Sequence, residues 1–358
     1  MNAAAKNYDG VNKYIRITDI DEASSTYTDK DIVSPDGVLT DNYLVNNRDI
    51  LLARTGASTG KSYLYKKSDG KLYYAGFLIR ANVTTHDPYF VFSQLHTHRY
   101  WRWVSIMSAR SGQPGINSQE YSSFPIYTTS IEEESKIAKL LSLLDERIAT
   151  QNKIIDKLQS LINGISNQLL YANNGNSVLL GEILIERSER TKENNQHEVL
   201  SSTVKGIFSQ REYFSKDIAS ENNVGYKIIR LHDVVLSPQN LWMGNINYNG
   251  KFDVGIVSPS YKIFSIAEGF DKEYIAATLK THRALYNYML VSEQGASVVR
   301  RNLNMEEFEQ LVFKIPSFDQ QQKIGRTISV LNLRLELANK QKTLYEKEKQ
   351  YLLRQIFI

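Results

Sequence analysis

The sequence predicts an α+β chain in which two tandem heads of mixed helix and strand are separated by two long helices packed as an antiparallel coiled coil. Three observations lead to this fold class. The 358-residue chain repeats itself, each repeat begins with short strand-like runs broken by turn residues, and each repeat ends in a long apolar stripe with helical spacing. With 42% hydrophobic residues, the chain can bury a core in each head.

The internal repeat has two offsets. In its second part residue 116 aligns with residue 303, an offset of 187 (303 − 116 = 187), and residues 116–170 match the second copy without a gap. In its first part the offset is 184, which sets Thr97-His98-Arg99 against Thr281-His282-Arg283. A surface loop that differs by three residues accounts for the change, because such insertions cost little free energy.

The repeat divides the chain into four segments. A first head is expected at residues 1–128, a spacer helix at 129–174, a second head at 175–315 and a C-terminal helix at 316–358. Residues 178–183 open the second head with an apolar element that has no counterpart in the first copy. We therefore expect the first head to be truncated at its N-terminus or to start late.

Within the first head, residues 49–53 and 62–66 predict two strands, and the Gly/Ser/Thr-rich segment between them predicts a hairpin loop. Asp87-Pro88 predicts the start of a helix, because Asp is a favourable cap and proline fits the first helical position. His98-Arg99 is expected to lie on a further helix and to support the scaffold, with phosphate contact at the helix end as the alternative. Trp101 is expected in the core or at an interface.

The segment RTGASTGKS, residues 54–62, resembles a phosphate-binding loop at first sight. Such a loop needs four residues between its glycines and a helix after its Lys-Ser pair, whereas Gly56 and Gly60 enclose three residues and a strand is expected to follow. The sequence therefore argues against an ATPase. The cations Arg54 and Lys61 suit the phosphates or base edges of a nucleic acid, and a solvated turn is the alternative.

Both long helices carry an apolar seam in steps of four and three, which is typical of coiled coils. The first seam consists of Ile137, Leu141, Leu144, Ile148, Ile155, Leu158, Ile162, Ile165 and Leu169, with Gln151 at its one polar position. The second consists of Ile324, Ile328, Leu331, Leu335, Ala338, Tyr345, Leu352 and Ile356, and is weakened by Lys342 and Lys349.

Two matched seams in one chain predict an intramolecular antiparallel pair; the alternative is two amphipathic helices of an ordinary core. Residues 137–169 of the first seam would span roughly 50 Å at ~1.5 Å per residue. That length equals about one and a half turns of B-DNA at roughly 34 Å per turn. Two heads at that separation could read two half-sites with an unread gap between them.

Composition narrows the class of protein. The chain has no Cys, which excludes disulfides and Cys-ligated zinc and fits a reducing cytoplasm. It has no apolar run near 20 residues and no pattern of a signal peptide. A net charge of +4 permits binding to nucleic acid without demanding it.

Two motifs on the long helices resemble a known family. The segment SIEEESKIAKLLSLLDERI at 130–148, and IPSFDQQQKI at 315–324 running into the terminal helix, look like the spacers of specificity subunits of type I restriction-modification systems. The resemblance covers nearly the whole chain, including its two tandem target recognition domains. It implies a subunit with no catalytic residues, no metal and no cofactor of its own.

In that family each target recognition domain reads one half of a bipartite, asymmetric double-stranded DNA site. The helices fix the gap and dock two methyltransferase subunits, which use S-adenosylmethionine to methylate adenine. Motor-nuclease subunits that use ATP and Mg join them to cleave unmodified DNA. The resemblance thus implies cytoplasmic partners and no membrane.

Sequence-specific readout requires side chains that reach base edges, with cations on the phosphates beside them. We expect these side chains on loops, which commonly carry recognition. In the first domain the candidates for DNA binding are Arg54, Thr55, Ser58, Thr59, Lys61, Arg110, Ser111 and Gln113. In the second domain they are Ser237, Gln239, Asn240, Ser297, Arg300 and Arg301.

Two other functions are alternatives to DNA reading. An adenine methyltransferase would show an Asn- or Asp-Pro-Pro-aromatic motif, but Asp87-Pro88-Tyr89-Phe90 lacks one proline and Lys272 stands at the equivalent place in the repeat. The second alternative is a two-headed coiled-coil scaffold that binds proteins rather than DNA. A scaffold of that kind need not bind duplex DNA at all.

Overall fold

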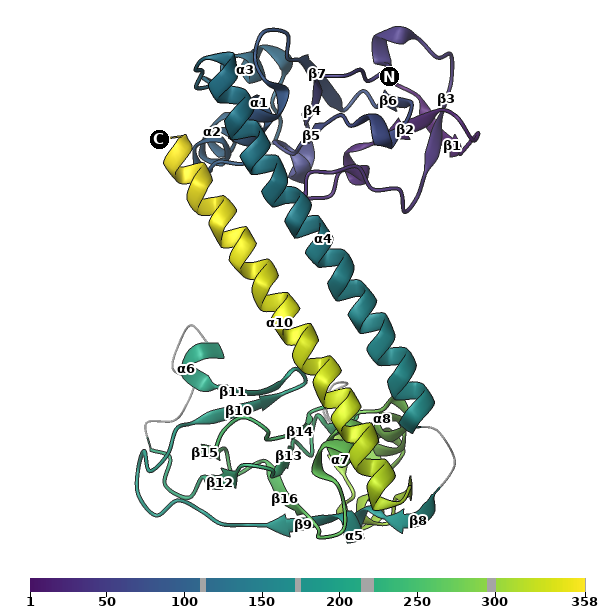
Figure 1. Cartoon of the computed structure of the whole chain (residues 1–358), viewed down its shortest axis with the longest axis vertical. Helices are drawn as coiled ribbons and strands as arrows, with labels where there is room; N and C mark the ends of the chain where they lie inside the picture. Colours follow the sequence, from purple (N-terminus) through teal and green to yellow (C-terminus); the bar gives the residue numbers. More distant parts are fainter. Residues whose placement is uncertain (110–113, 171–174, 214–221, 295–300, 358) are drawn as a thin grey trace. The chain divides into compact units, whose positions relative to one another are not determined.

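The computed structural model describes residues 1–109, 114–170, 175–213, 222–294 and 301–357. Its contacts divide the chain into two compact units: unit 1 comprises residues 1–154 and 338–358, and unit 2 comprises residues 155–337. Each unit is a mixed α/β head together with a part of both long helices (Figure 1). The α+β class is confirmed, whereas the four expected segment boundaries stay predictions.

Unit 1 contains a three-stranded antiparallel sheet in the order β5-β4-β7, a parallel pair β2-β6 and an antiparallel ribbon β1-β3. Its strands are β1 (Ala4–Asn7), β2 (Lys13–Ile15), β3 (Val33–Asp36), β4 (Asp49–Ala53), β5 (Ser62–Leu64), β6 (Leu72–Tyr74) and β7 (Leu78–Asn82). Its helices are α1 (Pro88–Gln94), α2 (His98–Ser108), α3 (Ser118–Ser122) and the first part of α4 (Ile131–Leu170). Four single turns complete it: η1 (Ile17–Asp19), η2 (Asp41–Tyr43), η3 (Gly56–Ser58) and η4 (Lys67–Asp69).

Unit 2 contains a four-stranded antiparallel sheet in the order β14-β13-β16-β9, together with two-stranded pairs. Its strands are β8 (Asn176–Leu179), β9 (Leu184–Arg187), β10 (Leu200–Thr203), β11 (Gly206–Ser209), β12 (Lys227–Arg230), β13 (Val234–Leu236), β14 (Ile246–Tyr248), β15 (Val254–Val257), β16 (Lys262–Ile266), β17 (Ser292–Gln294), β18 (Arg301–Leu303) and β19 (Val312–Ile315). Its helical elements are α5 (Leu180–Ile183), α6 (Gln210–Tyr213), η5 (Leu241–Met243), α7 (Lys272–Thr278), α8 (His282–Leu290), α9 (Met305–Glu309) and the first part of α10 (Phe318–Ile356).

The elements of the two units correspond at the offsets found in the sequence. Adding 184 carries β5, β7 and α1 onto β14, β16 and α7 with identical bounds, and adding 187 carries α3 onto α9. The same offset of 187 carries the start of α4 at Ile131 onto the start of α10 at Phe318. The repeat in the sequence is therefore also a repeat of secondary structure.

The two sheets differ at one edge. In unit 2, β9 pairs with the outer edge of β16, and β8 pairs with β19. Among the described residues of unit 1, no strand pairs with the equivalent edge of β7. This difference falls where the sequence of the first copy lacks a counterpart to residues 178–183.

Apolar positions in the strands and short helices build the cores of the heads. In unit 2 a single large cluster joins the sheet to α5, α7, α8 and α9, with Phe264, Tyr288 and Phe308 among its fully buried side chains. The clusters of unit 1 are smaller; one lies under α1 and α2, and another is centred on Ile15, Leu51 and Tyr63. These cores hold the sheets, and so hold the loops that follow β4 and β13.

Within unit 1, α4 and α10 pack antiparallel. Asp145 forms an ion pair with Lys349 (2.6 Å), and the Gln151 amide donates a hydrogen bond to the carbonyl oxygen of Ala338 (3.0 Å). As the residue number rises along α4, the number of its partner on α10 falls, which defines the direction. All residues of both predicted seams are buried or half-buried, so the predicted heptad faces are confirmed.

Groups of the head bind the first turn of α4 through Glu134. The Glu134 carboxylate is fully buried and accepts hydrogen bonds from the backbone N–H of Asp87 (2.9 Å) and of Thr129 (3.3 Å), and it lies 2.8 Å from His86 Nδ1. Burial alone would raise the pKa of Glu134, but these hydrogen bonds outweigh it and leave the pKa lowered. In unit 2 the neutral Gln321 takes the equivalent place (134 + 187 = 321) and accepts from the N–H of Asp271 (3.0 Å).

Candidate nucleic-acid interface

The loop after β4 in unit 1 is a hairpin connection, as predicted. Ala53 donates to the Lys61 carbonyl (2.8 Å) and Gly60 donates to the Ala53 carbonyl (3.1 Å), so β4 and β5 continue as an antiparallel pair around the single turn η3. A strand follows the Lys-Ser pair where a phosphate-binding loop would open a helix. The interpretation of RTGASTGKS as a hairpin loop is confirmed.

Two glycines give this loop its shape. Gly56 has a φ of +72° and Gly60 a φ of +94°, a region that residues with a Cβ rarely adopt. A Cβ on Gly60 would also lie 2.7 Å from Val104 Cγ1 and 3.0 Å from the ring of Trp101. The loop backbone therefore rests directly on α2.

Two buried tyrosines fix the end of the loop. The Tyr121 hydroxyl donates to the Ala53 carbonyl (2.6 Å) and accepts from the Gly60 N–H (3.0 Å), while the Tyr100 hydroxyl donates to the Gly60 carbonyl (2.8 Å). Burial raises the pKa of Tyr121 to about 12, so the phenol stays protonated and able to donate. Sequence reasoning missed both tyrosines, although Tyr121 was part of the repeat alignment.

The structure brings the loop together with the second predicted segment of unit 1. Gly56 donates to the Pro114 carbonyl (2.9 Å), Ile116 donates to the Arg54 carbonyl (2.9 Å), and Thr55 forms an isolated antiparallel bridge with Gly115. Arg110, Ser111 and Gln113, which precede this junction, lie outside the described residues. Two segments about 60 residues apart in sequence thus form one surface.

The predicted loop residues of unit 1 differ in their availability. Arg54 is exposed, and Thr55 and Ser58 are half-buried. Thr59 is buried and its hydroxyl donates to the Gly56 carbonyl (2.8 Å), so this side chain holds the turn. Lys61 pairs with Glu22 (3.0 Å), whose side chain is 83% exposed and can move aside for a phosphate.

Unit 2 presents an equivalent surface. Ser237 follows β13 and donates its N–H to the Asn245 carbonyl (2.9 Å), and Gln239 is exposed. The N–H of Arg301 donates to the Gln239 carbonyl (3.1 Å), which joins the loop to the second segment. Gln239 is equivalent to Thr55 (55 + 184 = 239) and Arg301 to Pro114 (114 + 187 = 301). This junction is therefore the counterpart of the one between Thr55 and Pro114 in unit 1.

The remaining candidates of unit 2 have distinct surroundings. The Asn240 side-chain oxygen is buried and has no hydrogen-bond partner among the described residues. The Arg301 guanidinium donates to the carbonyls of Met289 and Ser292 (3.2 Å each) and lies 5.3 Å from the ring centre of Trp242, so it stiffens the junction. Ser297 and Arg300 lie outside the described residues.

A glycine equivalence was also missed in the sequence. Gly60 and Gly244 correspond (60 + 184 = 244), have φ angles of +94° and +95°, and stand at the same end of their loops. Each packs against the equivalent residue of the following helix, Trp101 in unit 1 and Leu285 in unit 2. This equivalence could have been predicted from the sequence, because the offset of 184 aligns the two glycines directly.

Several residues outside the candidate loops have supporting roles. Asp87 caps α1 through the N–H groups of Tyr89 and Phe90, which confirms the ordinary explanation of the Asp87-Pro88 pair. The Arg99 guanidinium lies 4.2 Å from the ring centre of Tyr127 and 5.0 Å from that of Phe124, as expected of a scaffold residue. Trp101 is 44% exposed, so it lines the surface beside the loop and is not in the core.

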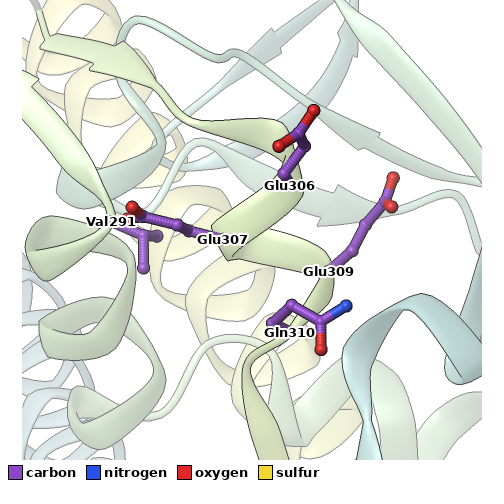
Figure 2. A pocket seen from close by; sticks show the side chains of 5 residues that line it. All are labelled: Val291, Glu306, Glu307, Glu309 and Gln310. Carbon is purple, nitrogen blue, oxygen red and sulfur yellow. The ribbon is translucent and has the colours of Figure 1, made fainter.

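A shallow hollow in unit 2 has the wrong charge for DNA. Figure 2 shows Glu306, Glu307 and Glu309 of α9 around it, with Val291 and Gln310. Three carboxylates would repel phosphates, so we leave this hollow outside the candidate interface. No group of three or more His, Asp or Glu in the described part of the chain could hold a metal ion. None of the described helices is both long and apolar enough for a membrane span.

Comparison with known proteins agrees with this architecture. Residues 1–160 match the family model "Type I restriction modification DNA specificity domain". The chain is similar to the S subunit of a type I restriction-modification system from M. genitalium, at 15% identity and a TM-score of 0.63, over 98% of this chain and 89% of that one. It is also similar to a chain from a structural study of complex assembly and conformational transition of the type I R-M system, at 12% identity and a TM-score of 0.50, over 96% of this chain and 90% of that one. Residues 1–160 therefore match the DNA specificity domain of type I restriction-modification systems, and the chain has the fold of the S subunit to which it is similar.

Proposed function

We propose that this protein binds a bipartite double-stranded DNA site and chooses the sequence on which a type I restriction-modification complex acts. Unit 1 reads one half-site and unit 2 reads the other. Base contacts come from the loop after β4, with Arg54 and Thr55, and from the equivalent loop after β13, with Gln239 and Asn240. The chain itself performs no chemistry.

One observation carries this proposal. Both units build the same kind of surface, in which a hairpin loop that ends at a glycine meets a second segment about 60 residues further along the chain. The scaffold beneath the surface is repeated, whereas the side chains on it are not: Thr55 is replaced by Gln239 and Arg54 by Pro238. A constant frame with variable loops is what reading two different half-sites requires.

The long helices supply the surface for partners. Several large apolar residues on α4 and α10 are roughly half exposed, although seam residues beside them are buried. In unit 1 they are Leu140 (46%), Leu143 (46%), Ile154 (43%), Leu344 (58%) and Tyr351 (62%); in unit 2 they are Leu161 (49%), Val330 (45%), Leu333 (55%) and Leu337 (55%). An exposed apolar stripe of this kind is typical of a protein-binding surface.

The repeat favours two copies of the same partner. Leu143 and Val330 are equivalent and exposed alike, and so are Ile106 (59%) and Leu290 (63%) on α2 and α8. We therefore propose two methyltransferase subunits, one at each half of the chain, with motor-nuclease subunits joining them. S-adenosylmethionine, ATP and Mg would be bound by these partners, and the complex would work in the cytoplasm.

The test combines sequence selection with variants. Purified protein, with its methyltransferase, is used to select from a duplex library, and binding to the selected site is measured over a salt series. We expect a two-part motif and an affinity that falls steeply with salt, because phosphate contacts release counterions. Replacing Arg54 by Ala should relax the first half-motif about tenfold and leave the second unchanged.

Lys67→Ala is the matched control, since Lys67 is an exposed cation of the same unit away from the loop. It should change neither half-motif. If the protein bound duplex DNA at no salt concentration yet captured its partner, the two-headed protein scaffold would be the correct function. If Arg54→Ala relaxed both half-motifs together, the assignment of one half-site to each unit would be wrong.

A further inference from the structure

Because the chain is duplicated, its two long helices could pair in more than one way. Both α4 and α10 carry a heptad seam, and the two are equivalent in the repeat. Each could therefore pair antiparallel with its own copy in a second chain, because apolar seams alone do not distinguish partners. Something must favour the pairing of α4 with α10 that unit 1 shows.

The first distinguishing feature is a contact between two residues of the helix pair that are equivalent in the repeat. Gln151 and Ala338 are equivalent residues (151 + 187 = 338), and they face each other, with the Gln151 amide 3.0 Å from the Ala338 carbonyl oxygen. A long polar side chain is thus matched by the smallest apolar one. Two copies of α4 would instead set Gln151 against Gln151, and two copies of α10 would leave a void between two alanines.

The second feature lies nearer the head. Asp145 and Lys349 form an ion pair of 2.6 Å, with side chains 35% and 18% exposed, and the Tyr89 hydroxyl donates to the other oxygen of Asp145. The offset of 187 makes Asn332 the equivalent of Asp145 and Ile162 the equivalent of Lys349. The ion pair therefore exists at one of two equivalent positions.

Pairing of α4 with α4, or of α10 with α10, in two chains would remove both the Gln151–Ala338 contact and the Asp145–Lys349 ion pair. In the register set by Gln151 and Ala338, two copies of α4 would put Ile162 at the position from which Lys349 contacts Asp145. Two copies of α10 would put Asn332 at the position from which Asp145 contacts Lys349. Neither arrangement pairs the charge. Leaving a partly buried charge without its partner is unfavourable.

We propose that Asp145, Lys349 and Gln151 select the intrachain pairing of α4 with α10 over the pairing of like helices between two chains. The apolar seams supply the attraction, and these polar residues supply the choice of partner. The same residues also fix the register, since a shift of one heptad would separate Asp145 from Lys349. This role does not depend on what the two heads bind.

The absence of Cys from the sequence allows a direct test. In the full chain, Ala338→Cys introduces one thiol at the centre of the pair, buried under α4. Two such chains can form a disulfide across this position only when α10 pairs with α10. Mild oxidation followed by non-reducing electrophoresis then measures like pairing, and light scattering gives the oligomeric state.

The reporter is combined with charge variants. With Lys349→Asp or Asp145→Lys, like charges face each other in the intrachain pair, and the crosslinked fraction should rise at least tenfold over the reporter alone. The double variant Asp145→Lys/Lys349→Asp should return it most of the way to the starting value, because the ion pair is restored in reverse whereas the hydrogen bond from Tyr89 is not. Glu146→Lys is the matched control, since it reverses an exposed neighbouring charge and should have no effect.

The melting temperature distinguishes a change of partner from general damage. We expect each single reversal to lower it by roughly 5 °C and the double reversal to recover it. Either of two results would overturn the proposal: crosslinking that the single reversals leave unchanged, or a double reversal that stays as crosslinked as the singles.

Discussion

Single side chains explain why the candidate DNA surface of unit 1 has a defined shape although it is built from a loop rich in small residues. Gly60 allows the chain to turn and to touch α2, and the hydroxyls of Tyr100 and Tyr121 hold its carbonyl and its N–H. Each of these hydrogen bonds is buried, so breaking one leaves a polar group without a partner. The loop is thus held in one conformation before any ligand arrives.

Replacing Gly60 by Ala should be more damaging than the same change at the equivalent Gly244. Both residues have φ near +95°, so both variants carry backbone strain of about 1–2 kcal/mol. A Cβ at Gly60 would also meet Val104 Cγ1 at 2.7 Å, whereas a Cβ at Gly244 has its nearest neighbour at 3.7 Å. We expect the first variant to lose about 1–3 kcal/mol more of the free energy of unfolding.

Urea unfolding of the two single variants measures this difference, with each head followed by its own tryptophans, Trp101 and Trp103 in unit 1 and Trp242 in unit 2. Equal losses at Gly60 and Gly244 would show that α2 gives way to the added methyl group. The description of the loop as resting on α2 would then be incorrect.

His96 should make the stability of unit 1 depend on pH. Burial, with a smaller contribution from Lys349, lowers the pKa of His96 to about 4. Its hydrogen bonds fit the neutral ring, since Nδ1 lies 3.0 Å from the Phe92 carbonyl oxygen and Nε2 lies 3.0 Å from Ser25 Oγ. An unfolded His has a pKa near 6.5, so the unfolded chain takes up a proton first as the pH falls.

The stabilising effect of a neutral His96 is therefore present above about pH 6.5 and is lost as the pH falls to about 4. The loss should be roughly 2–3 kcal/mol. His96→Gln should flatten the dependence of the melting temperature on pH in this window, while changing the exposed His98 to Gln should leave it as it was. A dependence that survives in His96→Gln would have to come from other groups.

Among the elements, the C-terminal end of α10 is a structural part of unit 1. Leu353 is 1% exposed and Phe357 is 7% exposed, and they pack with Phe90, Ala138 and Leu141. The rings of Phe90 and Phe357 have centres 5.2 Å apart. The last residues of the chain therefore complete the core of the head formed by the first ones.

Truncation of Leu353 to Ala should lower the free energy of unfolding of unit 1 by about 2–5 kcal/mol, because it removes a buried side chain and leaves a cavity. Leu344→Ala is the control on the same helix: Leu344 is 58% exposed, and its loss should cost less than about 0.5 kcal/mol. Thermal unfolding followed by circular dichroism measures both. Similar losses in the two variants would mean that α10 does not dock through Leu353.

Elements with a strong periodic signal were predictable from the sequence, and contacts made by tertiary packing were not. The seams from Ile137 to Leu169 and from Ile324 to Ile356 repeat at a fixed step, so local pattern was sufficient. The hairpin around RTGASTGKS followed from its spacing and flanks. The ion pair of Asp145 with Lys349 joins positions 204 residues apart, and only the helix register reveals it.

The candidate surface was predicted only in part, because its loops have a local sequence pattern whereas the contacts that hold them do not. The loops after β4 and β13 stand out by composition and by their equivalence in the repeat. Thr59 also stands out by composition, but its hydroxyl is used within the turn. Tyr100 and Tyr121 carry no local signal of a role in the loop, because their hydroxyls bond to residues 40 and 68 positions away in the sequence. The DNA contacts themselves stay predictions.

For the whole molecule, the repeat gives a physical reason for a bipartite site. If each unit reads one half-site, as proposed, two equivalent units on one chain double the length of DNA that is read without enlarging either head. Both α4, with 40 residues, and α10, with 39, run without a break from one unit into the other. We propose that these helices act as a ruler, so that changing their length changes the unread gap.

A lengthened helix pair tests the ruler, provided that the register of α4 with α10 is kept. Inserting the same number of heptads after Gln151 and after Ala338 satisfies this condition, because these two residues face each other. Three heptads add 21 residues to each helix, or about 31 Å at 1.5 Å per residue. That is close to one turn of B-DNA, so we expect a gap longer by about nine to ten base pairs with both half-motifs unchanged.

One heptad in each helix should behave differently. It adds about 10 Å, or roughly three base pairs, and those base pairs rotate the second half-site by about 100° around the DNA axis. The heptad turns the helix itself by only about 20°, so the second head would face the wrong side of the duplex. We expect this variant to select weak or single half-motifs. Selection from a duplex library measures both outcomes, and an unchanged gap in the three-heptad variant would rule out the ruler while leaving the assignment of half-sites to the two units intact.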